Sequence, residues 1–161
     1  MFVLGFHSDY DYGMPRRSID FRSFQQFRDD VVSISQGSYT RAGTWSLAEV
    51  ADHLSRALEM SMDGTIAKAP VVLRLMSPAI KRVILFRRKM PAGVKAPVGL
   101  IPESTPADAP AVAKLLADID RYTQFNQPLK PSPLFGHLTR DEWDQIHLIH
   151  ASHHLSFLNK A

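Results

Sequence analysis

The chain contains no cysteine, and no long uninterrupted apolar run occurs among its 161 residues. Without cysteine it cannot form a disulfide framework, a thiolate nucleophile or a cysteine-ligated zinc site. A membrane-spanning helix needs about 20 mostly apolar residues, so none is expected. The first residues also lack the basic start of a secretory signal. We therefore expect a cytoplasmic protein without a membrane partner.

The sequence also lacks a large excess of charge of one sign. The net charge is only +3 with the histidines neutral, which is too small to indicate a nucleic-acid partner. The basic residues gather in KRVILFRRK, residues 81–89. The apolar centre of this stretch predicts a short helix that packs on the core and exposes a basic end, although the same pattern suits a lipid surface. These bases could also steer an anionic substrate toward the protein.

Helix start signals recur along the chain. In a capping box, a Ser or Thr and a Glu or Gln three residues later bond each other's backbone amides. The sequence holds three such pairs: Ser23 with Gln26, Ser46 with Glu49, and Thr139 with Glu142. Apolar residues at helical spacing follow each pair, and no alternating strand pattern of comparable length competes with them. Trp45, just before the second pair, is placed to pack on Val50 as a hydrophobic staple.

Two further helices are expected in the middle of the chain. Ser77 and Pro78 suit the start of the first, because proline lacks the amide hydrogen that is unpaired at that position. Five prolines and two glycines between residues 90 and 110 predict a long crossover loop. Asp108 or Thr105 is placed to cap the helix that follows.

The length of the chain suits one domain with a single core. The fold class predicted from these elements is all-α: a four-helix bundle with an extra short helix and a proline-rich crossover loop. This single domain is expected to cover residues 1–161, of which residues 1–17 form an N-terminal extension.

Histidine is concentrated near the C-terminal end of the chain. Of the seven histidines, four lie in one stretch, DEWDQIHLIHASHHLSFL, residues 141–158, which predicts a helix. At about 100° per residue, His147, His150 and His154 share one face of that helix, and His153 lies on its flank. Two imidazoles at i and i+4 can bind one metal ion, and His150 and His154 have this spacing.

A third nitrogen ligand could come from another helix. His53 lies on the core-facing side of the second predicted helix, and bundle cores often hold metals between facing helices. The alternative for each of these residues is a hydrogen-bonded core histidine that binds nothing. The remaining histidines are expected elsewhere: His147 packed in the core, His153 at or near the surface, and His7 and His137 in solvent.

Two stretches, TWSLAEVADHLSRALEMSMDG and PLFGHLTRDEWDQIHLIHASHHLSFL, give the chain a wider resemblance. Together they make nearly the whole chain resemble the DinB-like (YfiT-like) superfamily, and within it a branch known only as a domain of unknown function. The resemblance implies that the first metal ligand lies on the second helix, at His53. The other two come from H-x-x-x-H on the last helix, at His150 and His154. The chain departs from the family pattern at Ser132-Pro133, where a His-Pro is expected.

The resemblance also implies a class of function. Three imidazoles leave coordination positions open, as in catalytic rather than structural sites, and Zn, Ni, Fe or Mn each suit such ligands. The family implies a divalent-metal-dependent enzyme acting on a small-molecule substrate, either a thiol S-transferase or isomerase that uses a low-molecular-weight thiol, or a hydrolase. It further implies a homodimer. Glu49, one turn before His53, is interpreted as a cap residue rather than a general base. The alternative function is a non-catalytic metal-binding or interaction bundle.

Overall fold

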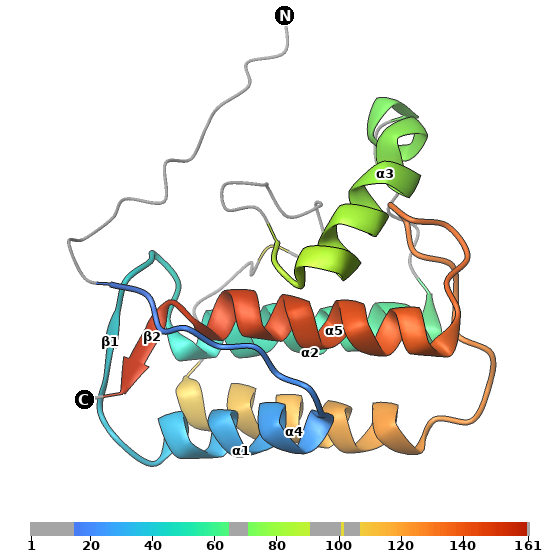
Figure 1. The fold of residues 1–161 in the computed structure, drawn as a ribbon. Coiled ribbons are helices and arrows are strands. Elements are labelled where there is room, and N and C mark those ends of the chain that lie inside the picture. The colour runs from blue at the N-terminus through green and yellow to red at the C-terminus, as the bar shows by residue number, and fades with distance from the viewer. Residues whose placement is uncertain (1–14, 65–70, 91–100, 102–106, 161) are drawn as a thin grey trace, which may run out of the picture.

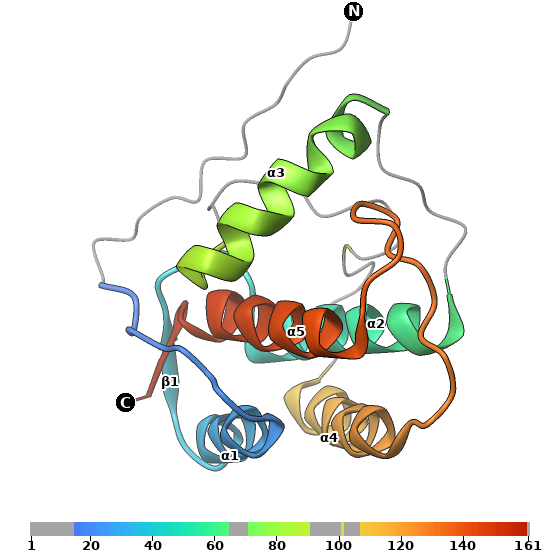
Figure 2. The same ribbon diagram turned by 45° about the vertical axis from the view of Figure 1, so that its right-hand side comes forward.

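The computed structural model describes residues 15–64, 71–90, 101 and 107–160, without the side chains of residues 71–73. These residues form helices and two short strands: α1 (Phe24–Ser35), β1 (Tyr39–Arg41), α2 (Leu47–Asp63), α3 (Val71–Arg87), α4 (Asp108–Gln124), α5 (Arg140–Leu155) and β2 (Leu158–Lys160). In Figures 1 and 2, α2 and α5 run side by side over α1 and α4, and α3 crosses above α5. The predicted all-α bundle is confirmed. Within the described ranges, none of the helices combines the length and apolarity needed to span a bilayer.

The bundle is held together by the apolar stripes of α1, α2, α4 and α5. Their central side chains are almost completely buried, among them Phe27, Val31, Leu54, Leu58, Leu115 and Ile119. Burying a leucine, isoleucine or phenylalanine side chain contributes about 1.5–3 kcal/mol each. This apolar core fixes α2 against α5, the two helices on which the predicted metal ligands lie.

The start of α2 is the most heavily capped helix end in the described structure. Both bonds of the predicted capping box are present, between Ser46 and Glu49. The next amides also have partners: Leu47 N donates to the Tyr39 hydroxyl and Ala48 N donates to Asp108 Oδ1. These bonds fix the first turn of α2, one turn before His53. The other two predicted helix starts are also confirmed, since Ser23 caps α1 and Thr139 forms a capping box with Glu142 on α5.

We expected from the sequence that Asp108 would cap α4, but it does not. It is the first residue of α4, whose N-cap is Ala107 with no side-chain cap bond. Its carboxylate turns instead to α2, where it accepts from Ala48 N at 2.8 Å and from the Tyr39 hydroxyl at 3.2 Å. A carboxylate is favourable at a helix N-terminus because of the helix dipole. Thr105, the other cap candidate, lies outside the described residues.

The extra helix, α3, is longer than the short helix that the sequence predicted. It begins at Val71 rather than after Ser77, so Pro78 lies inside it. A proline there removes the amide bond to the carbonyl of Arg74, but both residues are exposed, so water can replace the lost partner. The Ser-Pro pair resembles a helix start because the missing amide hydrogen of proline is tolerated both at the first position of a helix and at an exposed position within one. The predicted crossover between residues 90 and 110 lies mostly outside the described residues.

The last helix ends earlier than predicted, and a small sheet replaces its expected final turn. α5 stops at Leu155, and β2 pairs antiparallel with β1 in the register Tyr39 to Lys160. Arg17 helps to end the helix, since its guanidinium donates to the carbonyl of Leu155 and pairs with Asp30. The N-terminal extension expected over residues 1–17 therefore joins the bundle before its predicted end. Strands of three residues are too short for an alternating pattern to reveal.

Candidate metal centre

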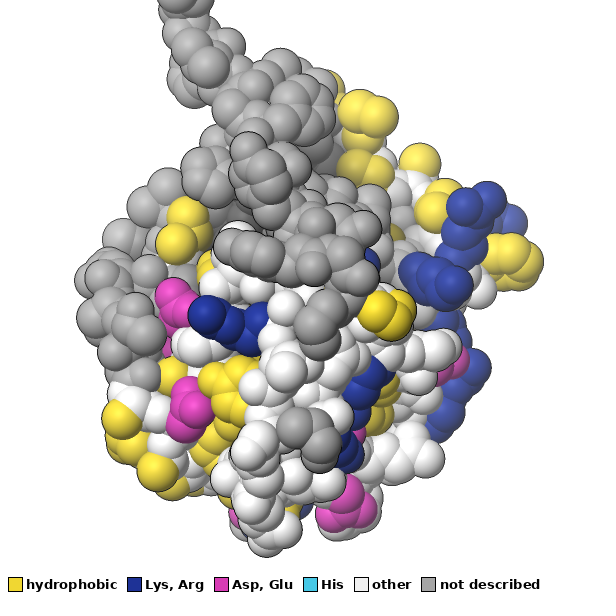
Figure 3. All heavy atoms as spheres, turned by 90° about the vertical axis from the view of Figure 1, so that its left-hand side faces the viewer, with side chains coloured by type: hydrophobic (Ala, Val, Ile, Leu, Met, Phe, Trp, Pro, Cys, Tyr) yellow, Lys and Arg dark blue, Asp and Glu magenta, His cyan; other side chains and the backbone are white. Residues whose placement is uncertain are grey.

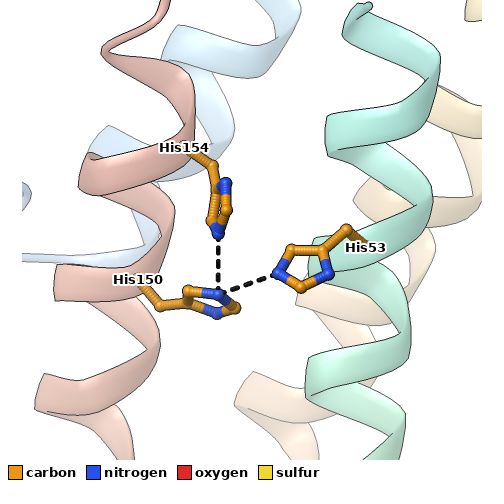
Figure 4. Close-up of side chains that lie close together, drawn as sticks. All are labelled: His53, His150 and His154. Carbon is orange, nitrogen blue, oxygen red and sulfur yellow. Dashed lines mark hydrogen bonds between the residues drawn. The ribbon is translucent and has the colours of Figure 1, made fainter. Parts of the chain in front are cut away.

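Two packed helices bring three imidazoles together. His53 extends from α2, and His150 and His154, one turn apart on α5, face it across the contact between these helices (Figure 4). His53 Nε2 lies 2.9 Å from His150 Nε2, and His154 Nε2 lies 3.0 Å from the same atom. One nitrogen from each ring lies within 4.8 Å of the other two. The structure thus gathers the three histidines named from the sequence at one point, close enough to hold a metal ion.

These separations suit ligands of a single ion. Imidazole nitrogens bind zinc at about 2.0–2.1 Å, so two of them lie about 2.9 Å apart at right angles around the ion, or about 3.3 Å apart at a tetrahedral angle. The separations of 2.9 and 3.0 Å fit the right-angled arrangement. Three ligands leave the other coordination positions of an ion to solvent or substrate.

Hydrogen bonding alone does not account well for this cluster. An imidazole nitrogen carries either one N–H or one lone pair, directed in the plane of the ring. His150 Nε2 nevertheless has two ring nitrogens at hydrogen-bond distance, one from His53 and one from His154. A single in-plane site can be aligned with only one of them at a time. A shared cation, by contrast, accepts all three lone pairs at once.

The surroundings keep these rings in the form that binds metals. Burial lowers the pKa of His150 well below the ordinary value of 6.5, and the nearby His154 and His53 lower it further. The pKa of His154 is likewise lowered, first by burial and then by His53 and other neighbours. Both rings are therefore neutral at pH 7, and a neutral imidazole offers the lone pair that a metal ion requires.

Trp45 forms a wall of this site, a role that its position before the helix did not reveal. We expected its ring to pack on Val50 as a staple. The structure places the indole parallel to the His154 ring, at 5.3 Å between centroids and 12°, and tilted against the His53 ring at 4.9 Å. One side chain therefore contacts ligand candidates from both helices and limits how their rings can rotate. The signal in the sequence was its closeness to His53, eight residues away.

The remaining histidines lie where the sequence placed them, as far as they are described. His147 is buried and its Nε2 lies 3.0 Å from Ser61 Oγ. Because that hydroxyl donates to the carbonyl of Leu58, it accepts from the imidazole N–H. His153 is half-buried, with its ring edge-on to that of His154, and His137 is exposed. His7 lies outside the described residues.

Nearby carboxylates have structural partners. Glu49 accepts from the backbone and hydroxyl of Ser46 in the capping box, so its predicted role as a cap is confirmed. Asp52 pairs with Arg56 at 2.9 Å on the same helix. Among the described residues, the group with ligand atoms close enough to share an ion consists of the three histidines alone.

A comparison with protein families places this chain among known sequences. A family model described as "Protein of unknown function (DUF1569)" matches residues 14–161. The chain belongs to the DUF1569 family. No curated protein and no solved structure matches it. The DUF1569 match includes Trp45, α2 and α5, so every residue of the candidate metal centre lies within the family domain.

Proposed function

We propose that His53, His150 and His154 bind one divalent metal ion, and that this DUF1569 protein is a metal-dependent enzyme of the DinB-like superfamily. The observation that carries the proposal is the convergence of three Nε2 atoms, two separations of which match ligands of one ion. The superfamily assignment is supported by the order of the motifs: a tryptophan before α2, a histidine within α2, and H-x-x-H-H on α5.

Each part of the site has a definite task in this proposal. The three rings hold the ion, the packing of α2 on α5 sets the distance between them, and Trp45 fixes the orientation of two rings. The bound ion supplies Lewis acidity, which lowers the pKa of a thiol or water that enters an open position.

We further propose that the reaction joins the sulfur of a low-molecular-weight thiol to an electrophilic carbon of a small substrate. The C–S bond would form as the bond from that carbon to its leaving group breaks, and the thiol proton and the leaving group would be released to solvent. A thiol with a pKa of about 8.5 loses its proton beside a cation without a protein base. Hydrolysis usually uses a positioned general base as well, and the carboxylates near His53 on α2 are engaged with Ser46 and Arg56. The chain has no cysteine, so the thiol is supplied from outside.

Metal content tests the site itself. We expect about one ion per chain in the purified wild type and none in His150→Gln, measured by inductively coupled plasma mass spectrometry, which also identifies the metal. His153→Gln is the matched control, since it removes an imidazole from the flank of the same helix and should keep the ion. Full metal content in His150→Gln would contradict the proposal.

Turnover tests the reaction class. The metal-loaded protein is mixed with an activated aryl halide and with glutathione, cysteine or 2-mercaptoethanol in turn, and with an activated ester without thiol. Consumption of the halide that requires a thiol and is at least tenfold slower in His150→Gln supports S-transfer. Ester consumption that ignores added thiol favours the hydrolase instead. A metal-loaded protein inert in every assay favours the non-catalytic metal-binding bundle.

A further inference from the structure

α3 presents large apolar side chains to solvent. At about 100° per residue, five of its residues fall within roughly 100° of arc on one face. We call this set the α3 stripe: Leu75, Met76, Ala79, Val83 and Phe86. The four large side chains are 78%, 56%, 52% and 88% exposed, in that order. The opposite face carries the buried Ser77 and Ile84, through which the helix lies against the bundle.

Arginines border the α3 stripe on both sides. By the same geometry Arg82 lies about 20° outside Leu75, and Arg87 lies about 20° outside Met76. Both arginines and Arg74 are exposed, and none of the three forms an ion pair with a residue that the structure describes. α3 contains no acidic residue. In Figure 3, apolar and basic side chains lie together on the upper right of the surface, where α3 lies.

The basic residues on the other side of the helix differ from these arginines. Lys81 pairs with Glu142 of α5 at 2.7 Å, and Arg88, just beyond the helix, pairs with Asp20 at 2.9 Å. These two ion pairs tie α3 to the bundle. Of the exposed arginines of α3 without a described ion pair, Arg82 and Arg87 therefore lie at the borders of the α3 stripe, and Arg74 lies about 100° from Leu75.

We propose that the α3 stripe docks on the surface of an anionic lipid bilayer. The helix lies parallel to the bilayer plane, its apolar side chains enter between the headgroups, and Arg82 and Arg87 contact lipid phosphates at its borders. Helices that bind membranes in this way join an apolar face to Lys or Arg on the polar side. Arginine also lets its apolar stem lie along the acyl boundary while its charge stays among the headgroups.

Charge argues for a bilayer over a second copy of the chain. A symmetric dimer through the α3 stripe would place the same patch on both subunits. Arg82 and Arg87 of the two copies would then meet at the margins without an acidic partner on either helix, and like charges facing each other oppose association. An anionic lipid surface supplies the missing negative charge. The sequence led us to expect no membrane partner because it lacks a spanning helix and a secretory signal, and because residues 81–89 were expected to pack on the core. The exposure of the α3 stripe removes the last of these reasons.

Vesicle co-sedimentation of the full chain tests the proposal. We expect binding to vesicles of phosphatidylcholine mixed with phosphatidylglycerol, weaker binding to phosphatidylcholine alone, and weakening by salt. Each arginine near an anionic surface contributes roughly fivefold, so Arg82→Gln with Arg87→Gln should lower the partition coefficient about 25-fold. Leu75→Gln with Phe86→Gln should lower it at least tenfold, and both positions are exposed, so the fold should persist.

Matched controls separate the α3 stripe from general surface properties. Arg41→Gln with Lys130→Gln removes the same charge at exposed positions elsewhere, and Ile101→Gln removes an exposed apolar side chain outside α3. Both controls should bind vesicles like the wild type. The proposal is overturned if the wild type binds neither vesicle, or if the controls lose binding as strongly as the stripe variants. It is also overturned if Leu75→Gln with Phe86→Gln abolishes a dimer seen by analytical ultracentrifugation while vesicle binding is unchanged.

Discussion

Two histidines of α5, His147 and His154, have similar stacking partners but different hydrogen-bonding partners. His147 is buried and stacked on Trp143, with ring centroids 5.1 Å apart and an angle of 14°. His154 is stacked in the same way on Trp45, at 5.3 Å and 12°. Each ring therefore lies against a different one of the two tryptophans of the chain. What differs is the group that each ring nitrogen meets.

The polar partner separates a packed histidine from a candidate ligand. His147 Nε2 has a serine hydroxyl, which accepts a hydrogen bond from its N–H. His154 Nε2 instead meets the nitrogen of His150, which also meets the nitrogen of His53. A buried polar group without a suitable partner costs about 1–3 kcal/mol, and a cation bound at the second cluster would give all three of its lone pairs a partner. Burial and aromatic stacking alone do not identify a metal site.

The largest expected effect is on metal-dependent stability. At a free metal concentration about 1,000 times Kd, binding stabilises the folded state by about 4 kcal/mol, which corresponds to roughly 8–16 °C in Tm for a chain of this size. We expect this rise in the wild type and in His147→Gln, and none in His150→Gln. Differential scanning calorimetry with and without zinc or nickel measures it. Equal rises in both variants would show that the two regions do not differ as the geometry indicates.

The next largest expected effect is on the free energy of unfolding, at the packed histidine His147. We expect His147→Ala to lower the free energy of unfolding by about 3 kcal/mol, because it leaves a cavity between Trp143 and Tyr122 and removes the partner of Ser61. Metal content should stay at the wild-type level. Urea unfolding of the metal-free protein gives the free energy, and mass spectrometry gives the metal. Loss of the ion in a variant that is still folded would instead make His147 part of the metal centre.

Substitution of Trp45 should have a smaller effect, on the metal affinity of the cluster of His53, His150 and His154. Groups that orient the ligands of a metal typically affect affinity by 10- to 100-fold, and Trp45 contacts only two of the three rings. We expect Trp45→Leu to weaken metal affinity about tenfold, measured by competition with a chelator. Trp45→Phe keeps a flat ring against His154 and should stay within about threefold of wild type. If both variants lose affinity equally, ring stacking does not position the ligands.

Much of this comparison could be predicted from the sequence, because it depends on local signals. Capping residues predicted the starts of α1, α2 and α5, and helical spacing placed His150 and His154 on one face. His53 could be named because its helix also has a clear apolar face. Each of these inferences uses residues close together in the chain, where spacing determines geometry.

The failures concern contacts between distant residues. Asp108 caps α2 rather than its own helix because Ala48, 60 residues earlier, lies beside it in the fold. Trp45 lies on imidazoles from two helices, and its closeness to His53 in the sequence does not indicate the contact with His154. The apolar centre of α3 was expected in the core, yet Val83 and Phe86 face solvent while Ile84 is buried. The spacing of apolar residues shows that a helix is amphipathic, but the elements packed against it determine which of its faces is covered.

The last expected effect is a pH dependence that separates the two regions without metal. Burial, and secondarily Arg140, lower the pKa of His147 from 6.5 to about 3. The unfolded chain therefore binds the extra proton between these values, and the stability from the neutral ring, complete above pH 6.5, is lost as the pH falls toward 3. The loss approaches about 1.4 kcal/mol per pH unit. We expect urea unfolding at pH 7, 6 and 5 in chelator to show this steeper decline in wild type relative to His147→Gln, whose amide can still donate to Ser61. Parallel declines in the two proteins would mean that the fold does not exclude the proton of His147.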